Sequence, residues 1–162
     1  MASRQPKWRN AVFVLLALAV VLADQASKSY IRANLDLGQS LFDIGFFRIV
    51  NVGNSGAAFG LFQGQSTLLT AIAVIGILAV VLCVFLAQHS LHFLDNMLVK
   101  SALGLVLGGT LGNLIDRLRF GYITDFLDFK VWPSFNVADS AITIGVIIFA
   151  FTLFTLPQQA RG

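Results

Sequence analysis

The sequence is poor in charge, in proline and in cysteine. Of its 162 residues only 12% are charged, none is glutamate, three are proline and one, Cys83, is cysteine. A single cysteine excludes an intramolecular disulfide and a thiolate metal cluster built within the chain. The eleven Lys and Arg residues give a net charge of +3, but they form no basic stripe, which argues against a nucleic-acid partner.

Long apolar stretches take the place of charge. Hydrophobic residues make up 57% of the chain and the mean hydropathy is +0.81, which argues against a soluble single domain. A helix of about 20 apolar residues crosses the hydrocarbon of a bilayer, and four stretches meet this criterion: 8–31, 67–87, 97–117 and 137–156. The sequence therefore predicts an all-α membrane protein, a single domain over residues 1–162 with both termini on one side.

The first apolar stretch fits two interpretations. Arg4, Lys7 and Arg9 before an apolar run are typical of a secretory signal peptide, and residues 21–23 resemble its cleavage site. We favour an uncleaved anchor, because residues 24–32 contain no helix breaker and three more apolar stretches follow. The basic N-terminus then places the termini in the cytoplasm, although the cations of the whole chain divide almost evenly between the two sides.

Two segments between the spans are too polar to cross a membrane and are expected on the extracytoplasmic side. In the first, 34–65, residues 47–52 favour a strand and Ile44-Gly45 favours a hairpin turn, which predicts a small sheet on the outer membrane surface. The second, 118–136, is rich in aromatic residues. It predicts an interfacial flap or a short amphipathic helix over a site.

The acidic residues gather at the extracytoplasmic face. In the four-span arrangement seven of the eight aspartates lie there, and only Asp95 lies at the other face. Asp125 stands just after the third span and Asp139 at the first turn of the fourth. Two carboxylates held close can share one proton, which suits general acid–base activation of water. The alternative is that both aspartates are helix N-caps, with Asn136 able to replace Asp139 in that role.

Other polar residues accompany the spans. Asp24 and Lys28 have the i,i+4 spacing of an ion pair, and we interpret them as an interfacial pair that ends the first helix, with Lys28 snorkelling. Asn113, Asp116 and Arg117 occupy neighbouring parts of one helix face. They are expected to form either a structural hydrogen-bond network or a shell that orients the acids.

The third span also carries three glycines at every fourth position: Gly104, Gly108 and Gly112. Small residues at this spacing let a second helix approach closely within a membrane. The spacing therefore predicts a helix–helix contact along this ridge.

Five motifs together resemble lipoprotein signal peptidase, the signal peptidase II family of bacterial aspartyl peptidases. They are DQxSK at 24–28, NSGAAF at 54–59, GGxxGNxxDR at 108–117, TDF at 124–126 and FNxADS at 135–140. The resemblance runs nearly end to end. It implies that Asp125 and Asp139 are the catalytic pair, with no metal and no cofactor. The substrate-binding or supporting residues that it implies are Asp24, Lys28, Asn54, Gly56, Asn113, Asp116, Arg117, Asn136 and Ala138.

The resemblance also implies a substrate and a location. The substrate is a prolipoprotein, cleaved just before a cysteine that carries diacylglycerol. The enzyme is expected to be a multi-pass monomer of the bacterial inner membrane, in contact with membrane lipid, with its active site toward the periplasm. A globomycin-like cyclic peptide is expected to block the site.

Two other function classes fit parts of the sequence. A proton- or ion-coupled transporter would use Asp24, Asp116 and Asp139 as a relay, but the acids gather at one face and do not trace a path across the membrane. A structural or assembly protein would explain the glycine ridge but not the acids.

Overall fold

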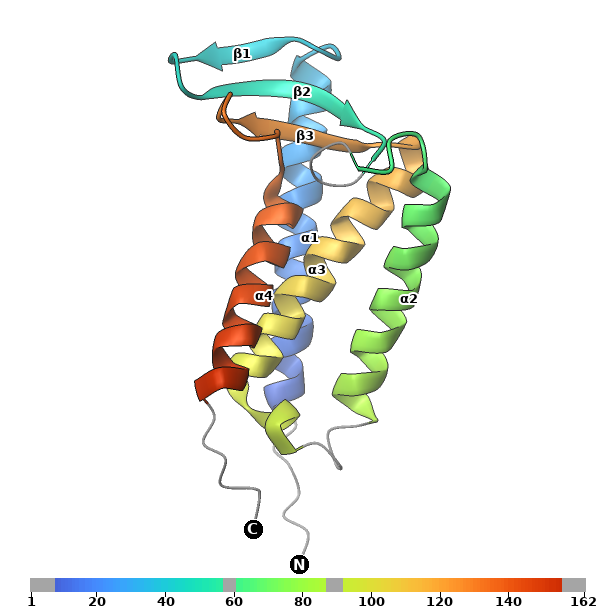
Figure 1. Cartoon of the computed structure of the whole chain (residues 1–162), viewed down its shortest axis with the longest axis vertical. Coiled ribbons are helices and arrows are strands. Elements are labelled where there is room, and N and C mark those ends of the chain that lie inside the picture. The colour runs from blue at the N-terminus through green and yellow to red at the C-terminus, as the bar shows by residue number, and fades with distance from the viewer. Residues whose placement is uncertain (1–7, 57–60, 87–91, 156–162) are drawn as a thin grey trace, which may run out of the picture.

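The computed structural model describes residues 8–56, 61–86 and 92–155. Four helices form a bundle that carries a small sheet at one end (Figure 1): α1 (Trp8–Asn34), α2 (Ser66–Phe85), α3 (Met97–Phe120) and α4 (Val137–Thr155). All four are long and apolar enough to cross a membrane. The prediction of four membrane-spanning helices with a small sheet is confirmed.

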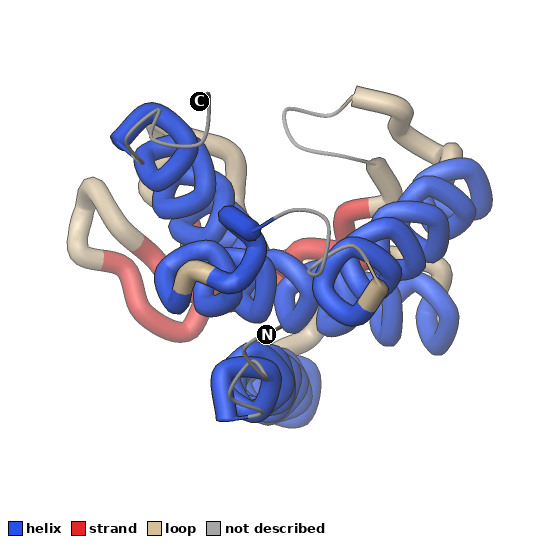
Figure 2. The backbone as a smooth tube through the Cα atoms, turned by 90° about the horizontal axis from the view of Figure 1, so that it is seen from below, coloured by secondary structure: helices blue, strands red, loops and turns tan. Residues whose placement is uncertain are grey.

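Helix α3 is the centre of the bundle. It packs against the other three helices, and a view along the bundle shows α2 and α4 on different sides of it (Figure 2). A short 3-10 helix, η3 (His92–Asp95), precedes α3, and Asn96 caps α3 by accepting a hydrogen bond from the Leu98 amide. Gly121 ends the helix in the left-handed conformation, with φ of 79°.

The glycine ridge of α3 explains how closely α1 approaches. A Cβ atom at Gly108 would lie 2.7 Å from the carbonyl oxygen of Ala17, and one at Gly104 would lie 2.8 Å from that of Phe13. The predicted contact along the ridge is therefore confirmed, and α1 is the partner. On another face of α3, Gly109 leaves room for the backbone of α4 at Ala138.

The sheet lies over the end of the bundle where α1 and α3 finish and where α4 begins (Figure 1). Its three antiparallel strands lie in the order β1 (Ser40–Asp43), β2 (Arg48–Asn54) and β3 (Ile123–Asp128). The predicted hairpin is confirmed, with Gly45 at φ of 85° in the turn. The expectation of an amphipathic helix within 118–136 is wrong for residues 123–128, which add a strand to the hairpin because their backbone pairs with β2.

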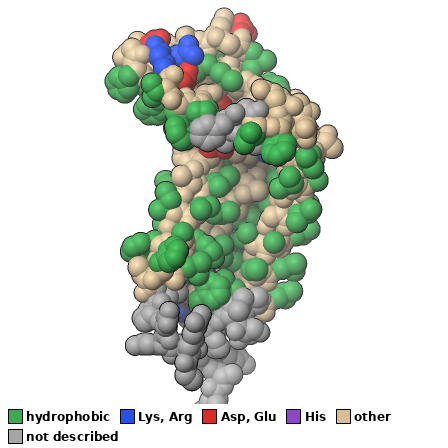
Figure 3. Space-filling view, in the orientation of Figure 1, with side chains coloured by type: hydrophobic (Ala, Val, Ile, Leu, Met, Phe, Trp, Pro, Cys, Tyr) green, Lys and Arg blue, Asp and Glu red, His purple; other side chains and the backbone are tan. Residues whose placement is uncertain are grey.

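Hydrophobic side chains cover the helices, whereas charged side chains gather over the sheet (Figure 3). Two clusters of buried hydrophobic residues hold the structure together, one within the helix bundle and one between the bundle and the sheet. Phe13, Ala17, Val84 and Leu107 join α1, α2 and α3, while the second cluster fixes β3 to the end of α1 through Ile31, Leu35 and Phe126. The second cluster holds β3 in place directly beside Asp125.

Candidate active site

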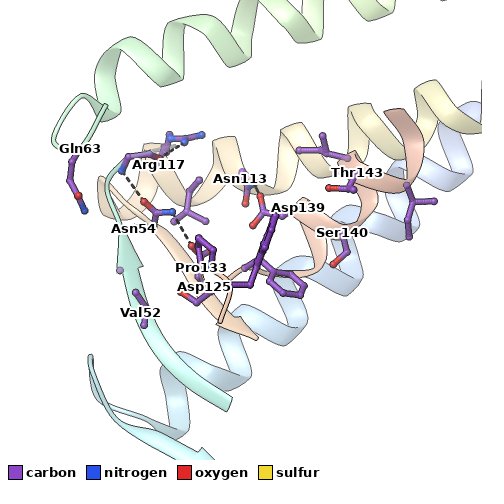
Figure 4. Close-up of a pocket in the computed structure, with 18 residues that line it drawn as sticks. Val52, Asn54, Gln63, Asn113, Arg117, Asp125, Pro133, Asp139, Ser140 and Thr143 are labelled. Atoms are coloured by element: carbon purple, nitrogen blue, oxygen red, sulfur yellow. Dashed lines mark hydrogen bonds between the residues drawn. The ribbon is translucent and has the colours of Figure 1, made fainter. Parts of the chain in front are cut away.

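Asp125 and Asp139 line one cavity at the sheet end of the bundle (Figure 4). The cavity has a volume of about 840 Å³ and is bounded by β2, α3, β3, α4 and the loop before α4. Asp125 comes from β3 and is 2% exposed, and Asp139 comes from the first turn of α4 and is half-buried. The alternative that Asp125 is a helix N-cap is wrong, because Asp125 lies within a strand.

Asn136 connects the two aspartates. Its side-chain nitrogen donates to Oδ1 of Asp125 at 2.7 Å, and its side-chain oxygen accepts from the backbone amide of Asp139 at 2.9 Å. The backbone amide of Asn136 donates in return to Oδ2 of Asp139 at 3.2 Å. This reciprocal pair is a capping box in which Asn136 precedes α4 and Asp139 is the third helical residue. Through these hydrogen bonds one fully buried residue, Asn136, holds both carboxylates.

The remaining carboxylate oxygens are also engaged. Asn54 of β2 donates to Oδ2 of Asp125 at 3.0 Å, and Asn113 of α3 donates to Oδ1 of Asp139 at 2.8 Å. The side-chain oxygen of Asn113 accepts from Nζ of Lys28 at 2.8 Å. An ammonium group can only donate, so Lys28 determines that the NH₂ group of Asn113 faces Asp139.

Lys28 belongs to a buried ion cluster between α1 and α3. Its Nζ lies 2.8 Å from Asp24 and 3.6 Å from Asp116, and all three side chains have no exposed surface. The interpretation of Asp24 and Lys28 as an interfacial pair that ends the helix is therefore wrong. Helix α1 continues to Asn34, and the pair is buried because α3 covers this face of α1.

The same cluster holds the backbone next to each aspartate. Oδ1 of Asp24 accepts from the amide of Ala138 at 3.0 Å, one residue before Asp139. Oδ2 of Asp116 accepts from the amide of Thr124 at 2.9 Å, one residue before Asp125. The cluster therefore ties the positions of the two carboxylates to α1 and α3.

Arg32 is a member of this cluster that the sequence analysis missed. It contacts Asp116 at 3.3 Å and donates to the hydroxyl of Thr124 at 2.8 Å. Its spacing was the available signal, because Asp24, Lys28 and Arg32 follow one another at i, i+4 and i+8 on one face of α1.

Arg117 of α3 is another residue that lines the cavity. One terminal nitrogen donates to the carbonyl of Gly56 at 3.1 Å, which ties α3 to the segment after β2. Its Nε is buried and has no partner among the described residues. Gly56 is required there, because a Cβ atom would lie 2.7 Å from the carbonyl oxygen of Leu61.

The surroundings of Asp125 favour its protonated form. Burial, and then the nearby charge of Asp139, raise the pKa of Asp125 to about 7, and the hydrogen bonds from Asn54 and Asn136 oppose this increase only in part. Asp125 is therefore able to hold a proton near neutral pH. By contrast, the pKa of Asp128 on the same strand is lowered: burial acts to raise it, but hydrogen bonds from the Lys130 amide and Arg48 outweigh that effect.

The residues selected from the sequence divide into two groups. Those that line the cavity are Asn54, Gly56, Asn113, Arg117, Asp125 and Asp139. Those that lie behind its wall are Asp24, Lys28, Asp116, Asn136 and Ala138. Cavity-lining residues that the sequence analysis did not select include Trp132, Ser134, Ile142 and Thr143. Within the described ranges no group of three or more His, Cys, Asp or Glu side chains is placed to hold a metal ion.

Known proteins with a similar sequence share this fold. The family model described as signal peptidase (SPase) II matches residues 16–155. The lipoprotein signal peptidase of Dehalococcoides mccartyi is 48% identical over 139 residues, which cover 86% of each chain, and that of Moorella thermoacetica is 46% identical over 93% of this chain and 97% of its own. A solved structure of a bacterial membrane enzyme superposes with a TM-score of 0.82 at 32% identity, over 93% of this chain and 92% of the other. The chain therefore belongs to the signal peptidase II family.

Proposed function

We propose that this membrane peptidase removes the signal peptide of prolipoproteins by cutting immediately before a diacylglyceryl-modified cysteine. The observation that carries the proposal is the arrangement of Asp125 and Asp139, which are bridged by Asn136 and line one cavity. Relatives named lipoprotein signal peptidase support the substrate class. The proposal treats residues 1–162 as one peptidase domain.

In this mechanism the two aspartates have different roles. Asp139 is ionised and takes a proton from a water molecule, whose oxygen then attacks the scissile carbonyl carbon. Asp125 is protonated and gives its proton to the carbonyl oxygen. The tetrahedral intermediate collapses when Asp139 returns its proton to the leaving amine nitrogen and Asp125 takes back the proton from the oxygen. Both carboxyls end in their starting states, and one peptide bond and one water molecule have been consumed.

The assignment of roles follows from the environments of the two residues. The raised pKa of Asp125, about 7, suits a group that starts protonated. Asp139 lies in the first turn of α4 and accepts hydrogen bonds from Asn113 and from the amide of Asn136. The positive end of a helix favours a negative charge, which suits the group that starts as the base.

The other selected residues support this chemistry from two positions. Asn54, Asn113 and Arg117 border the cavity, where they would hold the aspartates and the substrate backbone. Behind them the buried ion pairs between α1 and α3 would hold the two helices, and with them the cavity residues, in position. A globomycin-like cyclic peptide would inhibit by filling the same cavity.

The cavity suits a substrate that remains anchored in the membrane. Its wall on α4 includes Ile142 and Ile144, on a helix whose outward side chains are exposed and apolar. Acyl chains that stay in the bilayer contribute about 0.8 kcal/mol of membrane-binding free energy for each buried CH₂ group. Two chains therefore anchor the precursor firmly. We place the enzyme as a monomer in the bacterial inner membrane, with its site toward the periplasm and its termini in the cytoplasm.

A transporter has less support. Its proposed relay needs Asp24 and Asp116 to exchange protons, but both are fully buried in contact with Lys28. Asp24 and Asp116 also accept backbone amides that fix α4 and β3.

A cleavage assay in nanodiscs tests the proposed function. The substrates are one precursor peptide with a diacylglyceryl cysteine and the same peptide with an unmodified cysteine, and mass spectrometry locates the cut. We expect cleavage of the lipidated peptide only, directly before the modified cysteine. Equal turnover of both peptides, a cut elsewhere, or no cut at all would refute the proposal.

A further inference from the structure

The hydroxyl group of Thr143 is an unused hydrogen-bond donor in the cavity wall. Thr143 lies on α4 four residues after Asp139, which places it about 6 Å further along the helix and away from the sheet. Its exposed side chain lines the same cavity as Asp139 (Figure 4). The donor is therefore one helical turn deeper in the bilayer than the carboxylate.

Two other threonines of the spanning helices donate their hydroxyl groups within their own helix. Thr152 of α4 donates to the carbonyl of Ile148 at 2.7 Å, and Thr110 of α3 donates to that of Val106 at 2.7 Å. Among the described residues, Thr143 has no hydrogen-bond partner. The Thr143 hydroxyl is exposed at the cavity and is not used within the protein, so it is available to an acceptor on a bound ligand.

The proposed substrate carries acceptors at the corresponding distance. Its ester carbonyl oxygens lie on the glyceryl group, beyond the thioether of the cysteine next to the scissile bond. When extended, this connection spans about 9 Å, judged from ordinary bond lengths. An ester carbonyl can therefore reach a group one helical turn from Asp139. The neighbouring Ile142 and Ile144 offer the glyceryl group no other side-chain donor.

We propose that the hydroxyl of Thr143 donates a hydrogen bond to an ester carbonyl of the diacylglyceryl group, which makes Thr143 a specificity-determining residue. This inference rests on the proposed function. In this proposal the protein recognises the ester linkage between glycerol and acyl chain. The acyl chains contribute further affinity by remaining in the bilayer.

Two synthetic lipopeptides separate this contact from general membrane anchoring. One carries a diester glyceryl group, and the other carries a diether group with equal chain lengths and no carbonyl oxygens. For the wild type we expect kcat/KM to be about 3- to 10-fold higher on the diester, the factor that one neutral hydrogen bond supports. Thr143→Val should lose this preference by slowing on the diester alone, whereas Thr143→Ser, which keeps the hydroxyl group, should retain it.

Thr152→Val is the matched control, because Thr152 lies on the same helix with its hydroxyl already bonded to Ile148. This variant should retain the diester preference. The inference is overturned if the wild type shows no preference, if Thr143→Val keeps the preference, or if Thr143→Val slows equally on both substrates. If the wild type cleaves neither lipopeptide, the proposed function fails as well, so the two failures are distinguishable.

Discussion

Nζ of Lys28 lies 2.8 Å from the side-chain oxygen of Asn113, and this contact sets the direction of the Asn113 amide toward Asp139. A lysine with no exposed surface thereby acts on the cavity from behind its wall. Lys28 therefore has two roles. It orients Asn113 at the cavity, and it is the cation between two buried aspartates.

The first prediction concerns the proposed catalytic pair. Asp125→Asn and Asp139→Asn keep the size of the side chain but remove the acid or the base, so each should lower kcat by about 10²- to 10⁴-fold. Because paired carboxyls activate water without a metal, EDTA should leave the wild-type rate unchanged. The measurement is the cleavage rate for each mole of folded protein, with thermal unfolding in detergent as the folding check.

Asp128→Asn is the control for this experiment. Asp128 lies on the same strand as Asp125, but it pairs with Arg48 at 2.6 Å and does not line the cavity. The variant should keep most of the activity. Substantial turnover by Asp125→Asn or Asp139→Asn would show that the catalytic pair is assigned wrongly.

The second prediction concerns the pH dependence of the rate. Since the pKa of Asp125 is about 7, the proposed acid loses its proton as the pH rises through that value. The kcat/KM of a lipidated precursor should therefore fall above about pH 7. A profile measured from about pH 5 to about pH 9 checks this, and a rate that still rises at about pH 9 would contradict the role given to Asp125.

The third prediction applies the same pKa to stability. In the unfolded chain an aspartate titrates near its ordinary value of about 4, whereas folded Asp125 keeps its proton up to about 7. Its contribution to stability is fully present below about pH 4 and is lost as the pH rises through about 7. The wild-type Tm in detergent should therefore fall between about pH 4 and about pH 7, and the Tm of Asp125→Asn should fall less over the same range. An identical loss in both proteins would contradict the assignment.

The fourth prediction compares a buried lysine with an exposed one. Lys28→Met leaves Asp24 and Asp116 short of one buried cation, so it should lower the free energy of unfolding by about 3–5 kcal/mol. Lys130→Met removes an ion pair with Asp43 in which both side chains are partly exposed, so it should cost about 0–1 kcal/mol. Chemical denaturation in detergent micelles measures both, and equal effects would argue against a buried ion cluster.

The fifth prediction concerns the contact between α1 and α3. At Gly108 a methyl group would meet the Ala17 backbone, with its carbonyl oxygen at 2.7 Å, so Gly108→Ala should cost about 1–3 kcal/mol. At Gly76 of α2 a Cβ atom would have nothing within 4 Å. Gly76→Ala should therefore be neutral or stabilising by up to about 1 kcal/mol. Thermal unfolding of the two variants gives the comparison, and a Gly108→Ala variant as stable as the wild type would contradict the close approach.

Much of the architecture follows from the sequence, because it depends on local patterns. The apolar runs determine four spans, since their length matches the hydrocarbon thickness. Strand propensity and a glycine determine the hairpin of β1 and β2. The regular spacing of Gly104, Gly108 and Gly112 determines that another helix packs there. The motifs also pointed to Asp125 and Asp139, because side chains placed at the ends of two spans stand out in an apolar chain.

Tertiary structure decided what depends on partners far away in the sequence. Residues 123–128 form a strand because the hairpin of β1 and β2 offers them an edge, and their own sequence suggested a flap or a helix. Lys28 is buried because α3 covers α1 at this position, so snorkelling was the wrong expectation. Asn136 bridges Asp125 and Asp139 only after β3 and α4 have been brought together. Periodicity shows which face of a helix is polar, but the partner of that face is fixed only when the elements pack.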